Sequence, residues 1–102
     1  MEIITPSKSV ARTNFNEMNV QNILGITMTG AVSINLGDQF GNAVTVLEER
    51  VTFNVPAPRG TNAVAIINPE TGRPVIIRGR LVNGFLTFAS NIVGEFVFVR
   101  VR

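Results

Sequence analysis

The chain has 102 residues, enough for one hydrophobic core and too few for two. Hydrophobic residues make up 45% and charged residues 16%, so the chain is expected to fold and not to be disordered as a whole. It has no cysteine, no histidine and a net charge of +2, which excludes disulfides, Cys/His zinc sites and Ser-His or Cys-His catalytic pairs.

Residues 1–25 are rich in polar side chains, with apolar ones spaced among them in no regular period. Phe15, Met18 and Asn22 have a helical spacing, but the β-branched and Asn content disfavours a helix. We therefore predict an extended N-terminal arm with at most one helical turn. Terminal segments of this composition fray unless something holds them, so the arm is expected to dock on its own domain or on a neighbour.

A period of two begins at Ile26, where we place the start of a β-sandwich domain that spans residues 26–102. Polar side chains occupy one face of this first strand, which is the pattern of a half-buried strand. The other face is apolar and holds Met28, Val32, Ile34 and Leu36.

The next strands are separated by a loop and by a charged run. Residues 37–42 form the loop, and residues 43–47 resume a strand. The acidic and basic side chains at 48–50 then separate it from the alternation at 51–55. This run is either a bend that joins two short strands or a bulge in one long strand that crosses between sheets, and we prefer the bend. The Pro-Ala-Pro sequence at 56–58 ends the strand.

Three short signals follow in the second half of the chain. An apolar run at 63–67 and a second one at 75–77 flank residues 68–72, which carry a residue favoured in turns at each position. Asn83 and Gly84 lie between alternating apolar residues, and both tolerate the positive φ of a type I′ turn. This pair predicts a tight β-hairpin.

The last strand is apolar on both faces. Val97, Val99 and Val101 face one way, and Phe96 and Phe98 face the other. A strand of this kind is usually buried between two layers, so we expect one or both Phe side chains in the core. About seven strands spaced by roughly 8–12 residues predict a small antiparallel sandwich or barrel.

The charges are distributed unevenly along the chain. Residues 1–72 have a net charge of −2, and residues 73–102 have a net charge of +4. Either these cations are solvated and discourage edge-to-edge aggregation of the sheets, or they contact an anionic partner. The candidate contacts are Arg73, Arg78, Arg80, Arg100 and Arg102.

The same end of the chain permits a nucleic-acid interpretation. Phe96 and Phe98 share a strand face with Arg100 and Arg102, and single-strand binders combine aromatic side chains with a positive groove. A core strand whose end emerges into solvent explains the pattern better. A nucleic-acid-binding β-barrel is therefore the second alternative function, and nucleic acid is not the expected partner.

No catalytic, cofactor or metal site is predicted. Asp38, Asn42, Asn68 and Glu70 lie in two loops, but calcium loops usually supply several closely spaced carboxylates, so turn formation explains these residues. The other acidic residues are scattered, which is unsuitable for general acid-base catalysis. We predict that the chain is not an enzyme and carries no cofactor.

Five features follow one another in the second half of the chain: a strand that ends in Pro-x-Pro, a short strand, a Gly turn, a hairpin rich in Phe and Thr, and a closing Gly-x-aromatic strand. They occupy residues 51–58, 63–67, 68–72, 83–88 and 94–96. In these features residues 51–101, half of the chain, resemble the immunoglobulin-like β-sandwich modules of phage structural proteins and bacterial surface proteins. The resemblance implies an all-β, Ig-like sandwich of about seven strands with no catalytic motif.

Neither a membrane span nor a secretory signal is predicted. No stretch reaches about 18 consecutive apolar residues, and the first residues lack a basic segment followed by an apolar one. The chain as written is expected to be made in a host cytoplasm, or to be a fragment of something larger.

The predicted function is structural. We expect a virion subunit, a phage capsid decoration, cement or tail-associated protein, whose partners are a capsid or tail protein and copies of itself. Arm residues Ile3, Ile4, Phe15 and Met18 are predicted to make these contacts. The alternative is a binding or adhesion module of a bacterial surface protein, located at the cell surface.

Overall fold

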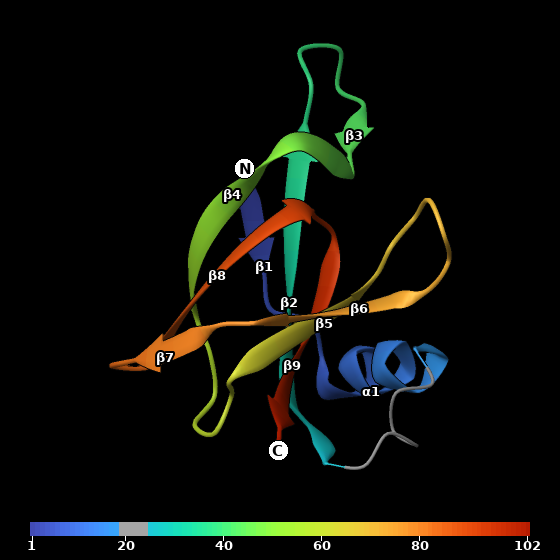
Figure 1. Ribbon diagram of the computed structural model, residues 1–102. Coiled ribbons are helices and arrows are strands. Elements are labelled where there is room, and N and C mark those ends of the chain that lie inside the picture. The colour runs from blue at the N-terminus through green and yellow to red at the C-terminus, as the bar shows by residue number, and fades with distance from the viewer. Residues whose placement is uncertain (19–24) are drawn as a thin grey trace.

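The computed structural model describes residues 1–18 and 25–102, so the part of the arm prediction that concerns residues 19–24 lies outside the described residues. Nine strands and one helix are present in the described part (Figure 1). They are β1 (Glu2–Ile4), α1 (Lys8–Glu17), β2 (Ile26–Gly37), β3 (Ala43–Val44), β4 (Val46–Pro56), β5 (Ala63–Ile67), β6 (Pro74–Arg78), β7 (Arg80–Val82), β8 (Phe85–Ile92) and β9 (Glu95–Val101).

The strands form two antiparallel sheets. One has the order β1-β2-β9-β5-β6, with β3 also paired to β2, and the other has the order β4-β8-β7. The chain passes between the sheets four times, at Thr45, at residues 57–62, at Gly79 and at residues 93–94. The prediction of a small, antiparallel all-β fold is therefore confirmed, with nine strands where about seven were expected.

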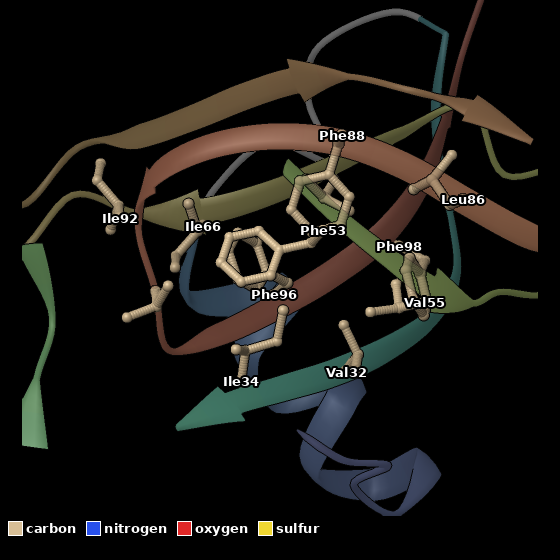
Figure 2. Close-up of a cluster of buried hydrophobic side chains, with 12 residues drawn as sticks. Val32, Ile34, Phe53, Val55, Ile66, Leu86, Phe88, Ile92, Phe96 and Phe98 are labelled. Carbon is tan, nitrogen blue, oxygen red and sulfur yellow. The ribbon is translucent and has the colours of Figure 1, made fainter. Parts of the chain in front are cut away.

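The main core lies between the two sheets and contains four phenylalanine rings (Figure 2). The ring centroids of Phe53 and Phe88 are 5.6 Å apart, and Phe96 meets Phe88 edge-on at 5.2 Å. Aliphatic side chains from β2, β5 and β8 complete this cluster, including Ile34 and Leu86, which are fully buried.

Strand β9 is buried on both faces, as its sequence predicts. Phe96 and Phe98 point into the main core and are 1% and 2% exposed. Val97 and Val99 point the other way and are fully buried in a second cluster. The fold thus has three layers, with the larger sheet in the middle.

The third layer is helix α1, which packs against β2 and β9. Phe15 and Met18 cover the outward face of the larger sheet, where Ala63 and Ala65 stand beside the β9 valines. Small side chains on β5 leave room for the helix to approach the sheet.

The prediction of an extended arm is wrong over residues 8–17, which form α1. The Ser7 Oγ caps the helix by accepting a hydrogen bond from the Val10 N–H at 3.3 Å. Ala11, Phe15 and Met18 then align on the buried side of the helix. Helix propensity in this segment is weak, so packing on the sheet supplies the stability that local preferences do not.

Two register shifts correct the strand predictions, one for the face on which Met28 lies and one for the continuity of β4. In β2 the pairing with β9 shifts between Met28 and Gly30, so the Met28 side chain joins the α1 cluster and not the face that holds Val32. In β4 the pairing with β8 shifts between Val46 and Val51. Residues 48–50 are thus an irregularity within one strand, and the preferred bend between two short strands is wrong.

The buried Ser90 side chain compensates for the irregular pairing opposite this shift. Its Oγ donates to the Ile92 carbonyl at 2.7 Å and accepts from the Ile92 N–H at 3.0 Å. Backbone groups in the interior need such partners, because an unsatisfied buried polar group is destabilising.

The hairpin predicted at Asn83 and Gly84 is confirmed. Both residues have positive φ, 53° and 82°, and Val82 pairs with Phe85 directly across the turn. These values match the left-handed conformations that a type I′ turn requires.

Replacing Gly84 by Val tests this turn. We expect the variant to lose more than about 1 kcal/mol, because a β-branched residue at positive φ is strained. A Cβ at Gly84 would meet no atom within 4 Å, so the loss would report backbone strain and not a clash. Urea denaturation measures it. Gly84→Asn is the matched control, and equal midpoints for the Val and Asn variants would contradict the turn assignment.

Candidate assembly interface

The β2–β3 loop is organised by a single carboxylate. Asp38 Oδ1 accepts hydrogen bonds from the backbone N–H groups of Phe40, at 2.8 Å, and Asn42, at 2.9 Å. The backbone closes the same loop, because the Asp38 N–H donates to the Asn42 carbonyl at 2.9 Å. Gly41 supplies the positive φ, 81°, that the turn needs. The sequence Gly-Asp-Gln-Phe-Gly-Asn therefore folds into a defined loop.

The hydrogen bonds to Asp38 also fix its charge. The backbone N–H of Asn42, together with that of Phe40, lowers the pKa of the Asp38 carboxyl below its usual value. Hydrogen bonds to the ionised form favour that form over the protonated one. At neutral pH the carboxylate is therefore ionised, the state in which it can accept these bonds.

The Phe40 side chain stands at the tip of this loop and is 79% exposed. The loop projects beyond the two sheets (Figure 1). Five of the seven Phe residues are buried and Phe85 is 44% exposed, so the Phe40 ring is the most exposed of the seven. An aromatic ring held in solvent on an organised loop is the feature expected of a contact with another molecule. The turn-forming residues at 37–42 predict this loop, but Phe40 was not among the predicted contact residues. An aromatic residue among turn formers was the available signal.

The four predicted arm residues divide into two pairs. Ile3 and Ile4 lie on β1, which pairs with residues 33–35 of β2, and are 43% and 44% exposed. Phe15 and Met18 are buried against their own sheet, at 7% and 4% exposed. The partner contact predicted for Phe15 and Met18 is therefore replaced by a contact within the chain. Ile3 and Ile4 stay accessible near the base of the Phe40 loop.

The five predicted arginines do not form one patch. Arg78 pairs with Ala63 near the end of β9 that carries Arg100 and Arg102. Arg80 belongs to the other sheet, where it pairs with Thr87, and Arg73 follows the β5–β6 turn at the opposite end of β5. The fold thus leaves Arg78, Arg100 and Arg102 at one end of the larger sheet and places Arg73 at the other end.

The aromatic platform of the nucleic-acid alternative is not accessible. Phe96 and Phe98 fill the core, so neither ring can stack on a base. In the two loops considered for calcium, Asp38 accepts backbone hydrogen bonds and Asn68 Oδ1 accepts the Glu70 N–H at 2.9 Å. Within residues 1–18 and 25–102, no three acidic side chains gather into a group that could hold a metal ion.

The described helix is too short and too polar to cross a membrane. The chain was also compared with protein-family models, with curated proteins and with solved structures. None of the three comparisons found a match to this chain.

Proposed function

We propose that the chain is a non-enzymatic structural subunit that attaches to a larger protein assembly through its β2–β3 loop. The observation that carries this proposal is the exposed Phe40 ring on a loop fixed by Asp38. Large aromatic anchors dominate many protein interfaces, and an organised loop loses little conformational freedom on binding. Ile3 and Ile4 on the neighbouring strand are also exposed, but successive side chains of a strand point to opposite faces, so at most one of them lies on the side of this contact.

A phage capsid or tail is the proposed setting, with decoration, cement or tail attachment as the role. The support is the resemblance of residues 51–101 to immunoglobulin-like modules of phage structural proteins, together with a sequence that lacks cysteine and histidine. In this role the chain occupies the virion, and it contacts a capsid or tail protein and other copies of itself. An adhesion module of a bacterial surface protein would use the same loop on a different partner.

Particles from the source organism provide the test. We expect mass spectrometry of purified particles to find the chain at a fixed copy number. Phe40→Ser should fold normally but bind the particle at least roughly 30-fold more weakly, because a central anchor contributes about 2 kcal/mol or more. Co-sedimentation of the purified protein with stripped particles measures the loss.

Two further variants sharpen this experiment. Val82→Ser removes another exposed side chain, 51% exposed on the other sheet, and should leave binding unchanged. Asp38→Ala keeps the Phe40 ring but removes the hydrogen bonds that order the loop, so it should weaken binding by a smaller factor. Normal incorporation of Phe40→Ser would refute the proposed interface. If the chain proves to be a segment of a long secreted protein, the adhesion module would be favoured over the virion subunit.

A further inference from the structure

A groove separates β6 from β8, and none of its described lining residues belongs to the Phe40 loop. Its volume is ≈ 360 Å³, and its lining residues include Ile76, Arg78, Ala89 and Asn91. β6 is the last strand of its sheet, and β7 pairs only with residues 85–87 of β8. Figure 1 shows β6 and β8 diverging from the β7 end. Two strand edges without a described partner strand thus face the same groove.

The hydrogen-bonding direction of β6 follows from its neighbour. The Gly79 N–H donates to the Asn62 carbonyl at 2.9 Å, on the side of β5. Because backbone groups alternate in direction along an antiparallel strand, those of Ile76 and Arg78 point away from β5 and into the groove. Pro74 belongs to the same alternating set, which agrees with its lack of an N–H.

The direction of β8 follows in the same way. The Ala57 N–H donates to the Gly84 carbonyl at 2.9 Å, so the even-numbered residues of β8 direct their backbone groups toward β4. The odd-numbered residues of β8 direct their backbone N–H and C=O groups toward β7. Beyond the end of β7, the N–H and C=O groups of Ala89 and Asn91 therefore face the groove.

The groove has a closed end and a positive charge. It closes where β6 passes into β7, because a Cβ at Gly79 would lie only 2.7 Å from the Thr87 carbonyl oxygen. Arg50, from the irregular part of β4, and Arg78 both line the groove, and none of the described lining residues is acidic. Ile76 adds an apolar side chain that is 36% exposed.

We propose that this groove binds an extended acidic segment of another protein by β-strand addition. The backbone of the guest strand would form hydrogen bonds with the backbone of Ile76 and Arg78 on one side and of Ala89 and Asn91 on the other. Arg50 and Arg78 would pair with its carboxylates, which selects an acidic guest over a basic one. This inference does not depend on the proposed function, since it concerns a different surface.

The probe is a short, capped peptide that alternates valine and glutamate, with a valine–lysine peptide as its control. We expect the acidic peptide to shift the amide NMR signals of Ile76, Arg78, Ala89 and Asn91 and to slow their hydrogen exchange. Replacing either Arg50 or Arg78 by Gln should weaken binding about two- to fivefold, the range of accessible ion pairs. The double variant Arg50→Glu, Arg78→Glu should prefer the lysine peptide.

Two more variants test the backbone hydrogen bonds of the groove and its independence from the Phe40 loop. Ile76→Pro removes an N–H that faces the groove but not one that bonds β5, so it should abolish binding while the fold persists. Phe40→Ser should bind the peptide like wild type. Signal changes elsewhere, or equal binding of both peptides, would overturn the proposal. So would concentration-dependent dimerisation that shifts the same amides without peptide, since the occupant would then be a second copy.

Discussion

Replacing Phe96 by Ala is expected to destabilise the protein by about 3–5 kcal/mol, as large aromatic-to-alanine changes do in cores. Phe96 is 1% exposed and lies between β2 and Phe88, whose ring it meets edge-on. The substitution removes buried apolar surface and leaves a cavity that neighbouring strands cannot fill. Domains of this size have total stabilities of about 5–15 kcal/mol, so the loss is a large share.

Chemical denaturation followed by circular dichroism measures the Phe96 effect. Phe85→Ala is the matched control, because Phe85 is 44% exposed and its loss should be much smaller, about 1 kcal/mol. If Phe96→Ala does not fold, Phe96→Leu should still fold with a smaller loss. Equal midpoints for Phe96→Ala and Phe85→Ala would mean that β9 does not hold the core together.

Removing residues 1–18 is expected to cause the other large loss. It deletes β1 and α1 and exposes the outward face of the larger sheet, where Val97 and Val99 are now fully buried. Phe15→Ala alone should lose about 3 kcal/mol or more, so loss of the whole helix should leave a protein that aggregates or unfolds without cooperativity. Thermal melts and size-exclusion chromatography provide the measurement.

Val10→Ala is the control for this experiment, because Val10 lies on the same helix but is 43% exposed. Its melting temperature should match that of the wild type. A truncated protein that remains monomeric with an unchanged melting temperature would show that α1 is dispensable for folding. In that case the N-terminal segment would again be a candidate for attachment to a partner.

The sequence by itself determined the features that depend on neighbouring residues. Asn83 and Gly84 specify their turn because both tolerate positive φ, whatever surrounds them. Phe96 and Val97 point to opposite sides because successive side chains alternate along any strand, and both are apolar, which places β9 between two layers. The loops at 37–42 and 68–72 likewise follow from their own turn-forming residues.

The tertiary structure decided what depends on residues far apart in the chain. Helix α1 forms because Phe15 and Met18 are buried in one cluster with the β9 valines, and helix propensity does not encode this packing. Alternation assigned Met28 to the wrong face, since the shift in its pairing with β9 reverses the side it occupies.

The candidate surfaces belong to the same category. Sequence places Phe40 in a loop, but its exposure depends on that loop projecting beyond both sheets. The groove between β6 and β8 exists because the chain changes sheets at Gly79, which leaves two edges facing one another. Strand partners and sheet edges are set by contacts across the whole fold, so no local pattern of residues can specify them.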